Sequence, residues 1–392
     1  MISNGLLQTS VQKAFVKNIN GTIQHNQILQ EVISHARRNR KTCHITFFDL
    51  KDAFGSRSHS LIDYVLDRYQ LPDNIKTYVN SLYSNICGTV SGPGWKSEQF
   101  NFRRGVFRGD PLSPTIFICV FNPLLEYLLS EVKHGYKLNT ETQIITTPFA
   151  DDFNVITTNV KTHQRILNNI EKFAKTMNLC LEPAKCKSLS ICSGCSKAVN
   201  FHLSNLIIDS IINSPEKFLG SQITFSGKQN EIFDYIYNDF TKSLENIDNS
   251  LIRGEYKVKI YSRYFLPSVR YKLTVHDVTN SNLVKLDALC DKYLKKWLSL
   301  PNCATMAIVH SAEGLDIKSI SHVYKEAHAT SHASSRMKGD QIVNTALESR
   351  IAREDTWTRK GSITSYSESH LNQALSNISP KTTFNKTVED IK

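Results

Sequence analysis

The hydrophobic and polar positions of the chain change their period along its length. Up to about residue 225, amphipathic stretches with the helical period alternate with short β-branched and aromatic stretches that are typical of strands. From about residue 231 the helical period dominates. The pattern predicts helices over residues 22–41, 58–69, 72–83, 111–131 and 162–177, and strands over 43–50, near 188–191 and near 218–225.

Two turns complete the first part of the chain. A Gly-Pro-Gly sequence at 92–94 predicts a turn between strands around Val90 and residues 100–102. Residues 144–157 are rich in strand-forming residues on both sides of Ala-Asp-Asp, which predicts a hairpin with two aspartates at its tip. Strands mixed with helices, followed by helices alone, indicate an α+β fold. We expect a subdomain boundary near residues 226–232.

Composition narrows the class of protein. The 392 residues are 40% apolar, enough to bury a core, which excludes disorder over the whole length. The net charge of +11 suits a polyanionic partner, although charge alone is weak evidence. Nine cysteines without a framework spacing favour a reducing compartment, and the apolar run 115–129 is too short and interrupted to span a membrane. The N-terminal residues do not show the basic and then apolar pattern of a secretory signal. We therefore expect an intracellular protein of the nucleus or cytoplasm, neither secreted nor membrane-bound.

Three aspartates occupy positions where buried strands should carry apolar side chains. Asp49 ends the strand 43–50, and Asp151 and Asp152 lie at the predicted hairpin tip. Carboxylates at such positions are costly to desolvate and need cations or hydrogen bonds. Oxygen ligands that converge from separate strands favour Mg²⁺. The alternative is that Asp151 and Asp152 only supply turn chemistry, and for an isolated Asp-Asp pair that alternative is the commoner one.

The sequence RRGVFRGDPLSP at 103–114 is a basic, glycine-containing loop that leads into a helix begun by proline. Its Gly105 and Gly109 permit a close backbone approach, and its arginines are suited to phosphate. Alone, this loop predicts no more than a turn and a helix cap.

Taken together, these segments resemble the reverse transcriptases of non-LTR retrotransposons. FFDLKDAFGS (47–56) resembles motif A, RRGVFRGDPLSPTIF (103–117) motif B and FADD (149–152) motif C of that family. LEPAKCKSL (181–189) is similar to motif D and EKFLGSQITFSG (216–227) to the primer grip of motif E. QKAFVKNINGTIQHNQ (12–27) is similar to the segment that precedes motif A.

The resemblance implies a right-hand polymerase, with an antiparallel palm sheet flanked by helices, partial fingers and a helical thumb. The divisions that it implies are partial fingers at 1–42, a palm with an inserted fingers segment at 43–228, a thumb at 229–338, and a polar, partly disordered segment at 339–392. The expected activity is RNA-directed DNA synthesis, with an RNA template, a DNA primer and dNTP as partners.

The resemblance also implies roles for individual residues. Asp49 and Asp151 match the ligands of two Mg²⁺ ions, for which Mn²⁺ can substitute, and Asp152 matches the second aspartate of motif C. Lys185 matches a proton donor to pyrophosphate, with Lys187 as the alternative match.

Further matches concern the substrates. Phe54 matches the steric gate, whose ring excludes a ribose 2′-hydroxyl. The other positions expected at the nucleotide are Asp52, Ala53, Arg108 and Gly109, and those of the primer grip are Phe218, Leu219 and Gly220.

Residues 253–272 interleave six basic with five Tyr or Phe side chains. Basic groups neutralise phosphates and aromatic faces pack on sugars or bases, which points to nucleic acid at Arg253, Lys257, Lys259 and Arg263. An amphipathic helix with its aromatic side chains in the core is an equally weighted alternative. In a thumb, binding is favoured.

Cys186, Cys192 and Cys195 with His202 invite a zinc interpretation, but a single CxxC without a second pair is a weak signal. We expect these cysteines to be ordinary thiols.

Three features depart from the family pattern. Arg108 stands where motif B usually has glutamine, and Ala14 stands in place of a glycine. The fingers strands that precede QKAF in the family are absent. We therefore expect a fragment or a decaying copy, with a catalytically inactive nucleic-acid-binding remnant as the alternative to an active polymerase. A maturase-like RNA-binding role ranks lowest.

Overall fold

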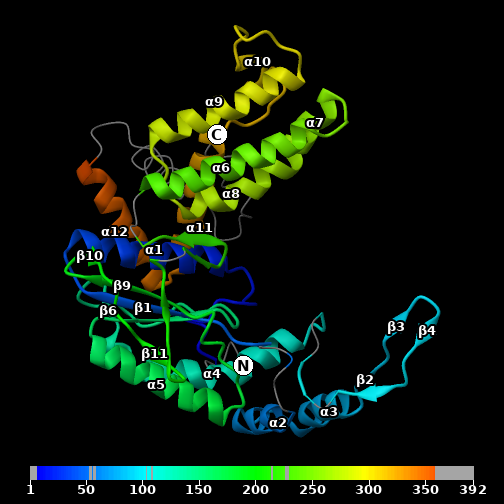
Figure 1. The fold of residues 1–392 in the computed structure, drawn as a ribbon, viewed down its shortest axis with the longest axis vertical. Helices are drawn as coiled ribbons and strands as arrows, with labels where there is room; N and C mark the ends of the chain where they lie inside the picture. The colour runs from blue at the N-terminus through cyan, green and yellow to red at the C-terminus, as the bar shows by residue number, and fades with distance from the viewer. Residues whose placement is uncertain are drawn as a thin grey trace. The chain divides into compact units, whose positions relative to one another are not determined.

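The structure, a computed structural model, describes residues 7–52, 55, 59–102, 104–106, 109–212, 215–225 and 229–357 (Figure 1). Its backbone contacts divide the chain into two units. The first consists of residues 1–25 and 32–214, and the second of residues 26–31 and 215–392.

A mainly antiparallel sheet forms the centre of the first unit, in the order β10-β9-β1-β8. Its strands are β1 (Cys43–Phe48), β8 (Phe153–Thr157), β9 (Lys187–Cys192) and β10 (Cys195–Ser196), and β13 (Asp209–Ser210) pairs in parallel with β9. All six residues of β1 are buried, so both faces of the sheet are covered. The expected strands at 43–50 and 188–191 are confirmed.

Helices supply that cover. Figure 1 shows α4 (Ser113–Ser130) and α5 (Val160–Thr176) on one side of the sheet and α1 (Gly21–Arg38) on the other. The core on the α4–α5 side includes Phe117, Ile166 and Phe153, and the ring of Phe153 stacks on that of Phe48 with their centroids 4.5 Å apart. This arrangement of helices on an antiparallel sheet confirms the expected α+β fold.

Helix α4 is the most apolar helix of this unit. By length and composition Ser113–Ser130 is able to cross a membrane, but 61% of that stretch is buried inside the protein. Pro114 lies in its first turn, where a missing N–H costs nothing. The apolar side chains of α4 are therefore explained by its place in the core.

The expected hairpin over 144–157 forms a β-bridge only at its tip, although the Ile156 N–H also donates to the Ile145 oxygen at 2.8 Å. Phe149 and Asp152 pair with each other there, but β8 takes β1 as its ladder partner. The preceding arm contributes β7 (Gln143–Ile144), which pairs with β6 (Tyr136–Lys137). Pro148 has no N–H to give to a ladder, so regular pairing does not continue through it to the tip.

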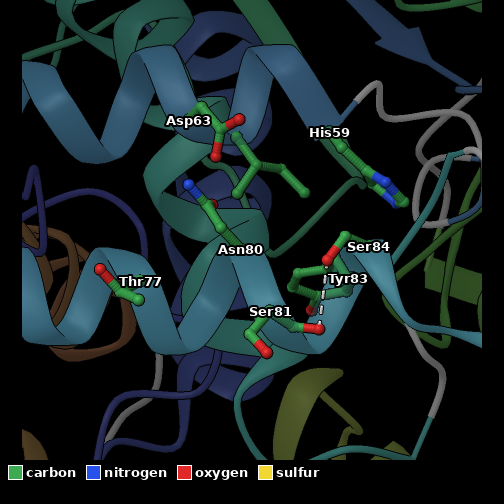
Figure 2. Close-up of a pocket in the computed structure, with 8 residues that line it drawn as sticks. His59, Asp63, Thr77, Asn80, Ser81, Tyr83 and Ser84 are labelled. Carbon is green, nitrogen blue, oxygen red and sulfur yellow. Dashed lines mark hydrogen bonds between the residues drawn. The ribbon is translucent and has the colours of Figure 1, made fainter.

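Helices α2 (His59–Arg68) and α3 (Asp73–Ser84) precede two short ladders, formed by β2 (Cys87–Gly88) with β5 (Phe100–Asn101) and β3 (Ser91–Gly92) with β4 (Trp95–Lys96). Both helices and the turn at 92–94 follow the sequence expectation. Figure 2 shows a pocket of about 470 Å³ between the two helices, lined by polar side chains that include His59, Asp63 and Asn80.

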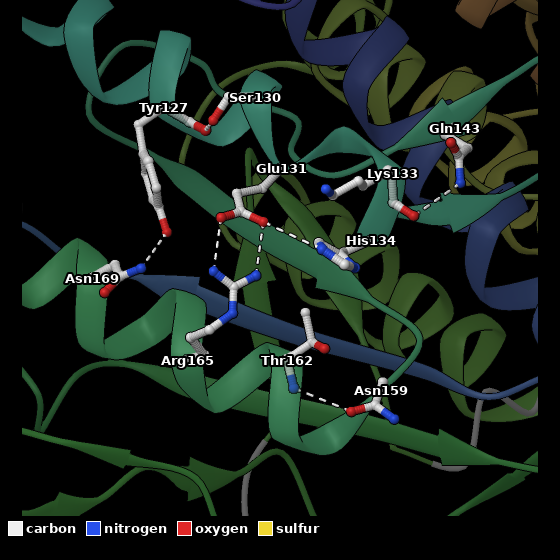
Figure 3. Close-up of polar contacts among 10 residues, drawn as sticks. All are labelled: Tyr127, Ser130, Glu131, Lys133, His134, Gln143, Asn159, Thr162, Arg165 and Asn169. Atoms are coloured by element: carbon white, nitrogen blue, oxygen red, sulfur yellow. Dashed lines mark hydrogen bonds and ion pairs between the residues drawn. The ribbon is translucent and has the colours of Figure 1, made fainter.

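Polar contacts tie the end of α4 to α5 (Figure 3). Arg165 donates two hydrogen bonds, of 2.8 and 2.7 Å, to the carboxylate of Glu131. Asn159 caps α5 by accepting a hydrogen bond from the Thr162 N–H. Next to α5, β11 (His202–Leu203) and β12 (Leu206–Ile207) form a small hairpin. These contacts hold α5 beneath the sheet that carries the aspartates.

The second unit is mainly helical. Its helices are α6 (Gln229–Asp248), α7 (Gly254–Ile260), α8 (Leu266–Val275), α9 (Asn280–Trp297), α10 (Ala307–His310), α11 (Ile320–Lys338) and α12 (Gln341–Trp357), with a π-helical turn at Tyr261–Phe265. Their core includes Phe240, Leu273 and Leu294. Helix α12 falls in the segment expected to be polar and partly disordered, where the buried side chains of Val343, Ala346 and Leu347 explain the order.

The strand structure expected near 218–225 is present, as a hairpin of two short strands. Strand β14 (Glu216–Phe218) pairs with β15 (Ser221–Ile223). Leu219 and Gly220 between them have φ angles of 46° and 78°, which is the left-handed conformation that a tight hairpin turn requires. The expected partition into fingers, palm and thumb stays a prediction.

Candidate active site

The ends of two adjacent strands bring the aspartates together. In the ladder of β1 with β8, Phe48 pairs with Phe153, so the next positions along the two strands are Asp49 and Asp152. Asp151 precedes Asp152 at the same end. Two segments about one hundred residues apart in the chain therefore meet at this sheet edge, as the sequence analysis expects.

The turn that carries Asp151 and Asp152 is tightly closed. The Phe149 N–H donates to the Asp152 oxygen at 2.8 Å, and the Asp152 N–H donates to the Phe149 oxygen at 3.1 Å. Within the turn, Ala150 has a φ of 54°, although it is not glycine. This conformation costs on the order of 1–2 kcal/mol for a residue with a Cβ, so surrounding structure must hold it.

The carboxylates influence one another electrostatically. Partial burial raises the pKa of Asp152 to about 6, and the charges of Asp151 and Asp49 contribute to that shift. The side chain of Asp152 keeps an exposed surface, so water still reaches it. Partial burial also raises the pKa of Asp49; Glu182 and Asp151 raise it further, whereas Lys185 opposes the shift. A cation at this edge would relieve the repulsion.

Lys185 and Glu182 lie beside Asp49. The Glu182 N–H donates to the Asp49 backbone oxygen at 3.0 Å, and Leu50 pairs with Leu181, so this segment runs along the end of β1. The Lys185 ammonium lies 2.8 Å from the Glu182 carboxylate and 3.8 Å from that of Asp49. Both carboxylates raise the pKa of Lys185, the hydrogen bond to Glu182 most of all. Lys185 is therefore protonated and 61% exposed beside the aspartates.

The alternative lysine is occupied elsewhere. Lys187 begins β9, and its ammonium lies 3.0 Å from the carboxylate of Asp209 on β13. Of the two matches that the sequence left open, Lys185 is the one that reaches Asp49.

The carboxylates at this sheet edge leave room for other ligands on a metal ion. Among the described residues, no three Asp, Glu, His or Cys side chains lie close enough together to hold a metal by themselves. Mg²⁺ commonly keeps several waters and takes only one or two carboxylates, with substrate phosphates completing its shell. The carboxylate oxygens of Asp49 and Asp151 are of the type that such an ion takes, and they would not form a closed protein cage.

The structure describes motifs A and B only in part. The Gly55 N–H donates to the Asp52 carboxylate at 3.3 Å, and Gly105 has a φ of 93°. A side chain at Gly105 would lie 2.8 Å from the Gly55 oxygen, so these two motifs touch through their backbones. Gly109 also has a positive φ, of 99°. The expected nucleotide contacts at Ala53, Phe54 and Arg108 lie outside the described residues.

The expected primer-grip residues lie in the second unit. Phe218 is buried, and the Leu219 backbone oxygen accepts hydrogen bonds from the Tyr271 hydroxyl and, at 3.2 Å, from the Asn26 amide. The Tyr271 ring would lie 3.2 Å from a Cβ at Gly220. The hairpin turn is thus anchored to α8 and to the middle of α1.

The basic and aromatic segment 253–272 divides its side chains between core and surface. Tyr261 and Phe265 are buried, as the amphipathic alternative expects. Tyr264 is 70% exposed, and Arg263 next to it is exposed as well. The other basic residues expected at nucleic acid differ in exposure. Arg253 and Lys259 are exposed, and the Lys259 ammonium lies 5.1 Å from the Tyr256 ring centroid. Lys257 is less exposed and donates to the Asp248 backbone oxygen.

Sequence reasoning missed Glu182 and Gln12. Glu182 comes three residues before Lys185, a spacing at which a charge pair on a helical turn is expected. Gln12 opens the segment similar to the one before motif A, but nothing in the sequence says that its side chain reaches Ala150, 138 residues away.

The cysteines considered for zinc have no common centre. Cys192 and Cys195 face each other across the β9–β10 ladder, whereas Cys186 is buried in the core. All nine cysteines are free thiols.

The sequence of this chain is similar to those of curated relatives over most of its length. It is 29% identical over 321 residues to the Pol polyprotein of the type-2 retrotransposable element R2DM of Drosophila melanogaster, covering 79% of this chain and 30% of the relative. It is 26% identical over 320 residues to the Pol polyprotein of a type-1 retrotransposable element R2 of Nasonia vitripennis, with the same coverages. The chain spans about a third of the length of these relatives.

Solved structures with a detectable likeness include telomerases. The telomerase of Candida albicans in complex with a fragment of telomeric RNA covers 88% of this chain and 51% of its own, at 13% identity and a TM-score of 0.42. Apo telomerase of Candida tropicalis gives 12% identity and a TM-score of 0.40, over 88% of this chain and 55% of its own.

The family profile described as reverse transcriptase (RNA-dependent DNA polymerase) matches residues 1–223. That stretch contains the aspartates, the motif B loop and Lys185. More than half of the chain is matched, and the curated relatives are retrotransposable-element polyproteins. The chain belongs to the reverse transcriptase family.

Proposed function

We propose that this chain catalyses RNA-directed DNA synthesis for a non-LTR retrotransposon, by adding deoxynucleotides to a DNA primer along an RNA template. The observation that carries the proposal is the convergence of Asp49, Asp151 and Asp152 at one sheet edge, beside the protonated Lys185. Family membership over residues 1–223 supports it.

Asp49 and Asp151 would hold divalent cations, Mg²⁺ in the first instance. Bound there, the cations would activate the primer hydroxyl and stabilise the leaving pyrophosphate. Asp152 would add negative charge to the site without serving as the main ligand. Lys185 would donate its proton to the pyrophosphate oxygen that leaves, since its ammonium is exposed and faces the site.

The template and primer would contact the second unit. Exposed Arg263, Tyr264 and Lys259 offer cations and aromatic faces on one segment, which suits a sugar–phosphate backbone. The hairpin turn at Leu219 and Gly220 would hold the primer end, because its backbone is fixed by Tyr271 and Asn26.

An assay on poly(rA)/oligo(dT) with Mg²⁺ and dTTP tests the proposal. Asp151→Asn should abolish extension and leave thermal unfolding nearly unchanged, because it removes a metal ligand and a repulsive charge together. Asp209→Asn is the matched control: this aspartate pairs with Lys187 on the same sheet, and its loss should leave extension within about twofold. Equal activity of wild type and Asp151→Asn would contradict the proposal.

We further propose that Phe54 selects the sugar. Its ring would lie where a ribose 2′-hydroxyl would overlap it, as the family resemblance implies. Phe54→Val should raise ribonucleotide incorporation relative to deoxyribonucleotide incorporation, measured by competitive single-nucleotide extension. The same discrimination in an active Phe54→Val variant would place the gate at another residue.

A catalytically inactive nucleic-acid-binding remnant is the second candidate. It is favoured by Arg108, a permanently charged donor where the family has a neutral glutamine. A guanidinium near Asp49 or Asp151 would compete with Mg²⁺ for the same oxygens. The remnant would bind the template–primer without extending it, and Arg108→Gln should then increase extension. No increase would show that Arg108 does not mark functional decay.

A further inference from the structure

The side chain of Gln12 lies inside the first unit, 1% exposed, next to the turn that carries the aspartates. Its Oε1 accepts a hydrogen bond from the Ala150 N–H at 3.0 Å and another from the Ala14 N–H at 3.1 Å. Its Nε2 donates to the Ala150 oxygen at 3.4 Å. One buried amide therefore satisfies both backbone groups of Ala150.

These bonds fix which way the amide points. The oxygen of Gln12 faces two N–H donors, so the opposite orientation would set its NH₂ against them. The amide is therefore held between the QKAF segment and the turn. Ala14, which replaces the usual glycine, has an ordinary negative φ and is fully buried, so the departure at this position leaves the bond intact.

Ala150 is the residue of the turn that most needs support. Its φ of 54° is costly for a residue with a Cβ, and it is buried, so water does not supply partners for its N–H and C=O. The bonds between Phe149 and Asp152 close the turn from within but leave the groups of Ala150 pointing outward. The Gln12 amide makes the two hydrogen bonds to Ala150 that a neighbouring strand would otherwise make.

We propose that Gln12 is a positioning residue of the polymerase site: it holds Ala150 in its left-handed conformation and so sets Asp151 and Asp152 opposite Asp49. The inference rests on the proposed function for its catalytic consequence. A loosened turn would let the carboxylates separate, since their repulsion favours separation in the absence of a cation. Removing a group that orients a metal ligand typically weakens metal affinity about 10–100-fold.

A second glutamine provides a matched control. On α5, Gln164 Nε2 donates to the His202 oxygen at 2.8 Å, and its Oε1 accepts from the His202 N–H at 2.9 Å. It thus makes the same pair of bonds to one residue of a hairpin, but that hairpin carries none of the aspartates. Gln164→Met removes equivalent bonds from the same unit.

The experiment compares Gln12→Met with Gln164→Met in the full chain. Mn²⁺ binding is measured by water-proton relaxation, exchange of backbone amides by hydrogen–deuterium exchange, and extension as a function of Mg²⁺ concentration. Gln12→Met should speed exchange at Ala150, weaken Mn²⁺ binding and raise the half-saturating Mg²⁺ concentration, each about tenfold, with an unchanged KM for template–primer. Gln164→Met should speed exchange at His202 only.

Equal Mn²⁺ affinity in the wild type and Gln12→Met, or an equal loss in Gln164→Met, would overturn the proposal even if the wild type extends primers. Weaker Mn²⁺ binding in Gln12→Met would support it even if the wild type extends none, in which case the proposed activity alone fails. Gln12→Asn keeps a buried amide but is one methylene too short to reach Ala150. It should reproduce the Gln12→Met result, and it decides the matter if Gln12→Met does not fold.

Discussion

The aspartate turn of the first unit and the basic segment of the second unit hold their functional side chains in different ways. Around the turn, distant segments converge: the Glu182 N–H donates to the Asp49 backbone oxygen, and the Gln12 side chain bonds the backbone of Ala150. In the segment 253–272, residues close in sequence take different positions: Tyr261 packs in the core and Arg263 lies at the surface. A reaction at one phosphorus atom requires several side chains to converge on one point. Binding the repeating sugar–phosphate backbone of a nucleic acid requires only exposed positive charge along a helix.

Substitutions at the site in the first unit should therefore change the rate of nucleotide addition, and those in the basic segment of the second unit should change the affinity for template–primer. The largest difference should come from the two lysines of motif D. Lys185→Ala should lower the rate of nucleotide addition about 100-fold, since a general acid typically contributes that much or more, with little change in template–primer affinity. Lys187→Ala removes only the surface pair with Asp209 and should change the rate less than twofold.

Single-turnover extension distinguishes these two variants. Lys185→Arg, which keeps the positive charge but not a readily lost proton, should stay slow. Equal rates for Lys185→Ala and Lys187→Ala would show that motif D supplies charge or structure and no proton.

An intermediate effect is expected at the exposed arginine of the second unit. Arg263→Ala should weaken template–primer binding severalfold at physiological salt and lower the slope of log Kd against log salt by about one. The rate at saturating template–primer should not change. Lys292→Ala on α9, which also removes an exposed cation from this unit, is the control. An equal loss in both variants would mean that net charge, and no particular contact, drives binding.

The smallest effect concerns a histidine that serves the fold of the second unit. His310 Nδ1 lies 2.6 Å from the Ile317 oxygen and its Nε2 lies 3.1 Å from the Asp291 carboxylate. Only the imidazolium donates to both acceptors, and the bond to Asp291 raises the pKa of His310 above 6.5. The stabilisation is therefore fully present below pH 6.5 and is lost as pH rises through the raised pKa.

His310→Gln should lower the free energy of unfolding by about 1 kcal/mol at pH 6 and by less at pH 9. Urea unfolding at the two pH values measures this difference. A pH-independent loss would mean that protonation of His310, and the second hydrogen bond that it permits, adds no stability. Extension at saturating substrate should be unaffected, since this contact lies outside the aspartate turn.

Much of the local structure was predictable because local physics controls it. The helical period over 162–177 and the β-branched run at 43–50 recur as α5 and β1. The strand structure expected near 218–225 forms a hairpin because two residues with positive φ, Leu219 and Gly220, turn the chain back, and leucine gives no signal for that turn. The strand before Ala-Asp-Asp ends at Ile144, and Pro148, which lacks a ladder donor, lies between it and the tip.

The sequence by itself determined the motifs, their order and the chemical types at the site, because residue identity decides which atoms are available to bind a cation or donate a proton. Only the tertiary structure decided that Lys185 and not Lys187 reaches Asp49, and that Tyr261 is core while Tyr264 is exposed. It alone joined Gln12 to Ala150, because a contact across 138 residues depends on how the sheet and its flanking segments pack and leaves no periodic trace in the chain.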